Sequence, residues 1–187
     1  VMTLITVMSV MNGFQMNFID AIMEVSSYHI RAEKVPAEKS EAFTRLCSDN
    51  KNILSVTPFY EAQTLMTDES GRESSSLIRA IDPDVYNNDS GFHKEISMVE
   101  GSFDLSQPNN IVLGYTLARQ LRVSPGDTVN LLVLSGGNDV SLLSGDRNFL
   151  VTGLFKTGYS DINSAYSFIN LEDGEKYFGK AAEKLFG

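Results

Sequence analysis

The sequence has a single cysteine and few basic side chains. Because Cys47 is alone among 187 residues, no disulfide can form within the chain. Lys and Arg number 15 against 24 Asp and Glu, which gives a formal net charge of −9. This balance argues against nucleic-acid binding, which needs clustered Lys and Arg, and it disfavours docking onto anionic lipid head groups. The hydrophobic content of 42% is still enough to bury a core, in one large domain or two small lobes.

Motifs of common catalytic and cofactor sites are missing as well. The sequence has no G-x-x-x-x-G-K-[ST] phosphate loop and no G-x-S-x-G nucleophile turn. His29, His93 and Cys47 are scattered, whereas a zinc site needs such residues at ligand spacing. The aspartates of Asp82-Pro83-Asp84 are typical of a turn. We therefore expect no catalytic residue, no cofactor and no metal, although a soluble enzyme with a buried N-terminal helix stays open as an alternative.

One long hydrophobic run is present, VMTLITVMSVMNGF at residues 1–14. It has no basic segment before it and no small-x-small cleavage site, so it does not resemble a signal peptide. Eleven helical residues cover roughly 16 Å, about half of the hydrocarbon thickness of a bilayer. After Gly13 the apolar residues recur at helical spacing, as in Phe14, Phe18 and Ile22. The run is therefore either an ordinary buried helix or the outer end of a membrane helix that continues into a soluble domain.

Beyond this run the pattern alternates between strands and helices. Strands are predicted over residues 28–32, 53–66, 77–81, 111–113, 128–134, 149–155 and 165–169. Helices are predicted to begin near Pro36, Gly114 and Leu171, the last one capped by Asn170 with Asp173 in the reciprocal position. Residues 86–94, rich in Asn, Asp, Ser and Gly, are predicted as a loop. The fold class is therefore α+β or mixed α/β.

Four segments resemble one family of transport proteins. Residues 9–14, SVMNGF, resemble the end of the first membrane helix in the lipoprotein-releasing ABC transporter permeases, the LolC/LolE family. Residues 111–129 resemble the core signature of that family's periplasmic domain. The matching positions are IVLG at residues 111–114, then Leu117-Ala118, Leu121, Val123, Gly126-Asp127 and Val129. AIDP at residues 80–83 stands where members often have G-I-D-P, and residues 151–158 resemble the strand that follows. The pattern at residues 111–129 is shared with the wider group of MacB-like permeases, including efflux and cell-division types.

The resemblance implies a fold, a location and a mechanism. The fold would be α+β, with mixed sheets and packed helices in two lobes and a protruding β-hairpin. Residues 1–13 would end the first transmembrane helix, and residues 14–187 would form the periplasmic domain before the second helix, at the bacterial inner membrane. The domain would be non-catalytic, with an ATP-binding subunit and a second permease subunit as partners. ATP-driven motion would release a lipoprotein cargo to a periplasmic chaperone; the alternative is a MacB-like efflux or envelope-stress permease domain.

A long loop is the candidate partner site. Residues 135–148 separate two predicted strands that would pair as a hairpin, and such loops usually have about two to five residues. The centre of the loop carries apolar side chains with no evident core to reach, which is typical of a binding surface. Lipoprotein-releasing permeases have a protruding hairpin here that captures the chaperone in one subunit, but its usual prolines are missing, so cargo reception stays open. The predicted partner-binding residues are Asn138, Asp139, Val140, Ser141, Leu142, Leu143, Ser144 and Arg147.

Overall fold

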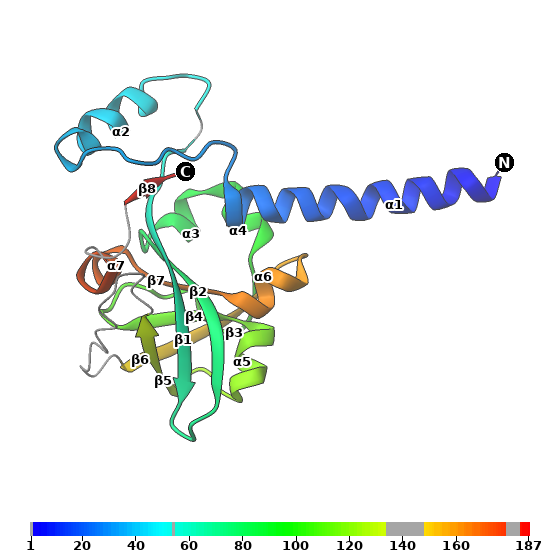
Figure 1. Ribbon diagram of the computed structural model, residues 1–187. Helices are drawn as coiled ribbons and strands as arrows, with labels where there is room; N and C mark the ends of the chain where they lie inside the picture. Colours follow the sequence, from blue (N-terminus) through cyan, green and yellow to red (C-terminus); the bar gives the residue numbers. More distant parts are fainter. Residues whose placement is uncertain (1, 54, 134–147, 179–183) are drawn as a thin grey trace.

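The computed structural model describes residues 2–53, 55–133, 148–178 and 184–187, and its centre is a mixed sheet of eight strands (Figure 1). The strands are β1 (Pro58–Asp68), β2 (Glu73–Ile81), β3 (Ser97–Gly101), β4 (Asn110–Gly114), β5 (Thr128–Val133), β6 (Asn148–Lys156), β7 (Tyr166–Asn170) and β8 (Leu185–Phe186). Their order is β2-β7-β4-β6-β5-β1-β8, and β3 pairs with β6. Because β1 also pairs with β2, the strands from β2 to β1 close into a ring.

Helices flank this sheet and precede it in the chain. They are α1 (Met2–Ala21), the π-helix η1 (Ile22–Ser27), the 3₁₀ helix η2 (Ala37–Lys39), α2 (Ser40–Ser48), α3 (Val85–Asn88), α4 (Ser90–Glu95), α5 (Tyr115–Leu121), α6 (Ser160–Ala165) and α7 (Leu171–Phe178). β2 pairs with β7 and β4 with β6 in parallel, whereas β1 pairs antiparallel with β2 and β5. The predicted α+β class, with mixed strand directions and packed helices, is confirmed.

Alternate residues of the strands enter two separate buried clusters, because successive side chains of a strand point to opposite faces. In β4, Ile111 and Leu113 belong to the first cluster and Val112 to the second. Helices α5 and α7 supply side chains to the first cluster. Helices α4 and α6, together with Val25 of η1, supply the second. The end of the N-terminal helix is therefore part of the core.

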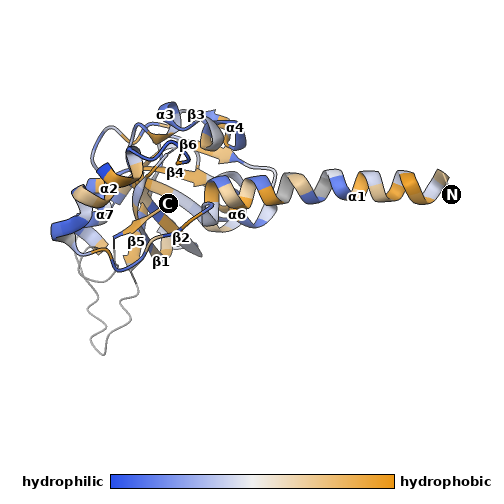
Figure 2. Cartoon of the chain, turned by 90° about the horizontal axis from the view of Figure 1, so that it is seen from above, coloured by the Kyte–Doolittle hydropathy of each residue, from blue (hydrophilic) through white to orange (hydrophobic). Residues whose placement is uncertain are grey.

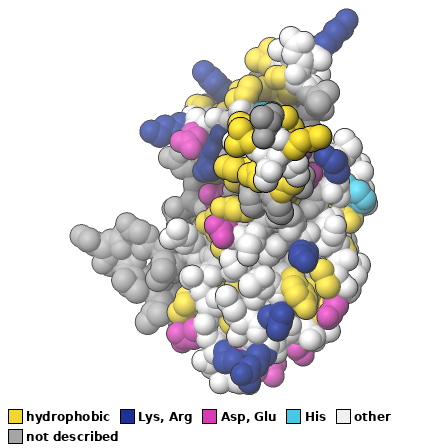
Figure 3. All heavy atoms as spheres, turned by 90° about the vertical axis from the view of Figure 1, so that its right-hand side faces the viewer, with side chains coloured by type: hydrophobic (Ala, Val, Ile, Leu, Met, Phe, Trp, Pro, Cys, Tyr) yellow, Lys and Arg dark blue, Asp and Glu magenta, His cyan; other side chains and the backbone are white. Residues whose placement is uncertain are grey.

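Helix α1 projects from the sheet as one continuous element (Figures 1 and 2). Asn12 and Gly13 lie inside it without breaking it, although both residues disfavour a helix interior. Most side chains of its first half are apolar, with Thr3, Thr6 and Ser9 between them, and hydrophobic side chains gather around the helix when it is viewed end on (Figure 3). Met2, Leu4, Ile5, Val7, Met8, Val10 and Met11 are between 55% and 84% exposed. Among the described residues, no helix has the combined length and apolarity of a membrane span.

The structure corrects three of the predicted elements. Residues 28–32 do not form a strand, and only Ala32 makes an isolated bridge, to Phe186. Residues 86–94 are not a loop but most of α3 and α4, because Val85 and Phe92 dock into the core and Asp89 caps α4 through the N–H groups of the next residues. Strand β1 begins at Pro58, not near residue 53.

The caps and turns predicted around prolines and helix starts are mostly confirmed. Asn170 caps α7 by accepting a hydrogen bond from the Glu172 N–H at 2.9 Å. Asp173 does not bind back to Asn170; its carboxylate instead accepts from the Asn109 N–H at 2.7 Å. Asp82 forms the predicted turn, accepting from the Asp84 N–H at 2.9 Å.

The segment between η1 and β1 is held against the last residues of the chain. Ala32 and Phe186 exchange two backbone hydrogen bonds, of 2.8 and 3.1 Å, and Thr57 and Gly187 exchange two, of 2.9 and 3.1 Å. The rings of Phe43 in α2 and Phe186 in β8 meet edge to face, with centroids 5.2 Å apart. We call residues 29–57 the α2 arm.

Candidate functional site: the junction between helix α1 and the sheet

The predicted partner-binding loop lies outside the described residues. This applies to Asn138, Asp139, Val140, Ser141, Leu142, Leu143, Ser144 and Arg147. The strands on either side are described, and β5 and β6 pair antiparallel from Thr128 opposite Leu150 to Asn130 opposite Asn148. The hairpin base thus has the predicted pairing, and the role of its tip stays a prediction.

The most distinctive described feature is a buried arginine at the end of helix η1. Arg79 lies in β2 between Ile78 and Ala80, and its side chain is 0% exposed. Its Nη1 donates to the Val25 carbonyl at 2.5 Å, and its Nη2 donates to the Ser26 carbonyl. Carbonyls in the last turn of a helix lack partners within the helix, so a guanidinium satisfies them and complements the negative end of the helix dipole.

The charge of Arg79 is balanced by a carboxylate on the neighbouring strand. Arg79 Nη2 lies 2.6 Å from Glu61 Oε2, and the two residues are directly opposite each other in the β1–β2 pairing. Glu61 also lies 3.6 Å from Arg31, which in turn pairs with Glu33 at 3.2 Å. A buried arginine needs such a partner, because an unpaired charge in the core is very costly.

Three aromatic rings surround the guanidinium. The Arg79 Cζ atom lies 4.7 Å from the ring centroid of Phe59, 5.1 Å from that of Tyr28 and 5.6 Å from that of Tyr166. Rings at these distances attract a cation through their quadrupole. The arginine, which is itself part of β2, is therefore held by contacts from η1, β1 and β7 at once.

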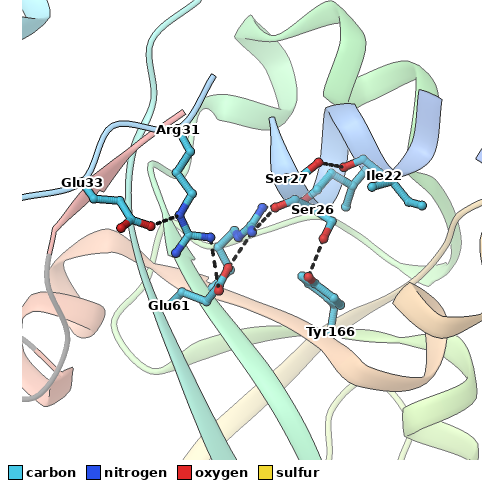
Figure 4. A network of polar contacts seen from close by, with 9 residues as sticks. Ile22, Ser26, Ser27, Arg31, Glu33, Glu61 and Tyr166 are labelled. Carbon is cyan, nitrogen blue, oxygen red and sulfur yellow. Dashed lines mark hydrogen bonds and ion pairs between the residues drawn. The ribbon is translucent and has the colours of Figure 1, made fainter. Parts of the chain in front are cut away.

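Further contacts join η1 to the rest of the domain. The hydroxyl groups of Ser26 and Tyr166 share a hydrogen bond of 2.6 Å (Figure 4). A Cβ atom at Gly91 would lie 2.2 Å from a Glu24 carboxylate oxygen, so Glu24 rests directly on the first turn of α4. We call Val25, Ser26, Glu61, Arg79 and Tyr166 the α1 junction.

The chain leaves the junction through Tyr28, in an unusual backbone conformation. Tyr28 has φ 58° and ψ 167°, a region that side-chain-bearing residues rarely adopt. Its ring packs on Phe59 with centroids 5.2 Å apart. Burial raises the pKa of the Tyr28 phenol, although the positive charge of Arg79 opposes the rise. The phenol is therefore neutral at physiological pH.

Arg79 was missed by reasoning from the sequence, although a signal was present. It is the charged residue inside the apolar run Leu77-Ile78-Arg79-Ala80-Ile81, and a charge in a buried strand calls for a partner. The sequence of this strand does not identify the carboxylate or carbonyl group that binds Arg79. Glu61 and Val25 are 18 and 54 residues away in the sequence.

The titratable residues weighed from the sequence do not assemble into a chemical site. His29 is exposed, and exposed His93 contacts the Tyr86 carbonyl through Nδ1 at 2.9 Å. Cys47 is half-buried in α2. In the part of the chain that the structure describes, no group of three or more His, Cys, Asp or Glu residues is placed to hold a metal. The contacts described for the junction hold the end of η1 against β1, β2 and β7.

A family model decides what kind of domain this is. The model of the MacB-like periplasmic core domain matches residues 1–183. The chain belongs to this family. The α1 junction described above is therefore part of a MacB-like periplasmic core domain.

Relatives of this MacB-like domain carry one recurring name. The lipoprotein-releasing system transmembrane protein LolC of Xylella fastidiosa is 29% identical over 180 residues, which cover 94% of this chain and 43% of that protein. LolC of Neisseria meningitidis serogroup B is 26% identical over 184 residues, which cover 92% of this chain and 42% of that protein. The chain spans less than half the length of these relatives.

Solved structures share the fold at lower identity. The extracellular domain of the noncanonic ABC-type transporter YknZ from Gram-positive bacteria matches with a TM-score of 0.53 and 12% identity, covering 83% of this chain and 80% of that one. The periplasmic region of MacB from Actinobacillus actinomycetemcomitans matches with a TM-score of 0.52 and 15% identity, covering 86% and 66%. At these identities the likeness shows the fold alone.

Proposed function

We propose that this chain is the periplasmic domain of a lipoprotein-releasing ABC transporter permease, and that it transmits motion without catalysing a reaction. The observation that carries the proposal is the similarity to LolC over more than nine-tenths of the chain. In this reading residues 1–13 end the first transmembrane helix, and residues 14–187 lie in the periplasm. The exposed apolar side chains in the first half of α1 support that division.

The geometry of α1 supports a role in transmission. A continuous helix that leaves an apolar environment and ends in the core of the sheet can pass a displacement directly to that sheet. The proposed partners are an ATP-binding subunit, a second permease subunit, a lipoprotein cargo and a periplasmic lipoprotein chaperone. ATP hydrolysis on the separate subunit would supply the motion, at the bacterial inner membrane.

The chaperone is proposed to dock on the loop between β5 and β6. This part of the proposal rests on the sequence, in which Val140, Leu142 and Leu143 form an apolar centre flanked by polar residues and Arg147. A hydrophobic contact with an adjacent cation suits a partner with an apolar rim and an acidic residue.

The first experiment measures chaperone capture by the full-length permease in detergent, with purified periplasmic lipoprotein chaperone as the probe. Replacing Val140, Leu142 and Leu143 together with Ser should weaken capture by at least about tenfold, because hot-spot side chains each contribute about 1–2 kcal/mol or more. The control is Leu46→Ser in α2, the same kind of change at a side chain that is 72% exposed. Unchanged capture by the triple variant, or equal loss in the control, would contradict the proposed docking site.

A second candidate function is an efflux or envelope-stress permease of MacB type. The match of residues 1–183 to the model of the MacB-like periplasmic core domain supports it. Release of a triacylated lipoprotein from proteoliposomes distinguishes the two candidates. An ATP-dependent transfer to the chaperone is expected for the first candidate, whereas the second predicts no transfer with the chaperone present.

A further inference from the structure

We propose that Arg79 is the positioning residue through which a displacement of α1 reaches the sheet. The proposal rests on the proposed function and names the residue that its mechanical step requires. Arg79 binds the last carbonyls of η1, which continues directly from α1, and it binds Glu61 on the adjacent strand. One side chain thereby links the helix to two strands.

The position of Arg79 in the sheet spreads that link over three strands. In the register of the sheet, Arg79 of β2 lies opposite Glu61 of β1 on one side and opposite Phe168 of β7 on the other. A displacement of the η1 carbonyls therefore acts on β2, which lies between β1 and β7. β1 and β2 run on for most of their length as a paired ribbon, from Tyr60 opposite Ala80 to Thr67 opposite Glu73. A tilt at the junction would thus be carried to the far end of the ribbon.

The chemistry of the contact requires an arginine. Its planar guanidinium presents several N–H groups in fixed directions, so it can bind two carbonyls and a carboxylate together. A lysine at the same place is a point charge on a flexible stem and cannot reproduce that geometry. The surrounding rings of Phe59, Tyr28 and Tyr166 fix the plane of the group and keep water away from it.

The form of η1 gives the contact a mechanical role. A π-helix is a rare conformation that tends to occur at functional sites, and here it separates α1 from the turn at Tyr28. The Ser27 hydroxyl donates to the Ile22 carbonyl at 3.2 Å across the π-helical turn. With its end released from Arg79, η1 is expected to relax, and α1 would then swing without moving β1 and β2.

Arg31 provides a matched control inside the same network. It pairs with the same carboxylate, Glu61, at 3.6 Å, but among the described residues its ion pairs are to Glu33 and Glu61 and none is to η1. Replacing Arg31 therefore removes a positive charge beside Glu61 while the helix stays attached. Replacing Arg79 removes the attachment while Arg31 still offers Glu61 a partner.

The test uses the complete transporter in nanodiscs, with Cys47→Ser and spin labels at Gln15→Cys in α1 and Gln63→Cys in β1, two exposed positions. Pulsed electron resonance should give a narrow distance distribution for the parent and for Arg31→Gln. Arg79→Gln should broaden it and reduce lipoprotein released per ATP hydrolysed by at least about tenfold, the loss expected when a charge-assisted contact is removed. ATP hydrolysis itself should continue, which a merely structural defect would not predict.

Arg79→Lys keeps the charge near Glu61 and is the second variant should Arg79→Gln fail to fold. It should also broaden the distance distribution, because a lysine cannot hold both carbonyls. A narrow distribution with normal coupling in Arg79→Lys, or equal defects in Arg31→Gln and Arg79→Gln, would overturn the proposal. The distance measurement needs no lipoprotein. A broadened distribution in a transporter that releases no lipoprotein would therefore uphold the role of Arg79 and contradict the proposed function instead.

Discussion

Gly174 shows how close packing can dictate a single residue. It lies inside α7, where Ala would be the better helix former, and it is buried. A Cβ atom at this position would lie 2.1 Å from the Ala80 Cβ and 3.5 Å from the Tyr60 ring. Helix α7 therefore touches β2 so closely that only a hydrogen atom fits between them.

Gly174→Ala is expected to destabilise the protein by about 1–3 kcal/mol, the usual cost of overpacking a core. Helix propensity alone would predict a gain of roughly 1 kcal/mol, so the sign of the change separates the two effects. Urea denaturation followed by circular dichroism measures it. Gly13→Ala is the control, because a Cβ there meets nothing within 4 Å and should not lower stability. A stabilising Gly174→Ala would show that α7 can move away from β2.

At the scale of elements, the turn of the β1–β2 hairpin joins a helix end. The Asp68 carboxylate accepts from the Arg72 N–H at 2.6 Å and forms an ion pair with the Arg72 guanidinium at 2.5 Å. Arg72 Nε also donates to the Leu121 carbonyl at 2.9 Å, in the last turn of α5. Burial raises the pKa of Asp68, but the hydrogen bonds and charge of Arg72 outweigh burial and hold it below its usual value.

This lowered pKa predicts a pH-dependent contribution to stability. Asp68 binds its proton less tightly in the folded chain than in the unfolded chain. Its contribution to the free energy of unfolding is therefore complete above the unfolded pKa of about 4, and it is lost as the pH falls through the folded pKa. Asp68→Asn should therefore lower the urea midpoint at pH 7 and have a much smaller effect near pH 2. Glu73→Gln, at an exposed position of the same hairpin, should change stability by less than about 0.5 kcal/mol at either pH. A pH-independent difference for Asp68→Asn would refute the argument.

At the scale of the whole molecule, the α2 arm is bound to residues 185–187. The α2 arm follows the α1 junction, and β8 lies between Ala32 of the arm and Phe59 of β1. Phe186 is buried and contacts Phe43 of α2. Helix α2 itself has no buried residue. The arm is therefore expected to depend on β8 for its order, whereas the ring of strands does not.

Phe186→Ala should release the α2 arm without unfolding the sheet. Losing a buried phenyl ring costs about 3–5 kcal/mol, which is enough to raise amide hydrogen exchange in the α2 arm by roughly a hundredfold or more. Exchange in β4 and β7 should stay slow. Leu46→Ala, at an exposed side chain of α2, is the control and should leave exchange in the arm unchanged. Equal acceleration across the sheet would mean that the arm and the sheet unfold together.

Structural features that depend on residues close together in the chain could be predicted from the sequence. The apolar runs that became β4, β5 and β6, the turn at Asp82 and the Asn170 cap were all predicted close to where they lie. A run of apolar residues bounded by turn formers has few other ways to bury its surface. The short motifs at residues 9–14 and 111–129 also indicated the family whose model matches residues 1–183.

What only the tertiary structure decided concerns partners that are distant in sequence. The polar segment of residues 86–94 became helical because Phe92 meets Phe168 from a remote strand, with ring centroids 5.4 Å apart. Arg79 could not be assigned to Glu61, Val25 and Ser26 before the sheet and η1 were placed together. The sequence by itself determined β4, β5, β6, the turn at Asp82 and the family, since these depend on short-range pattern. The tertiary structure decided how α1 is attached, because that attachment is formed by side chains that only the closed sheet brings into contact.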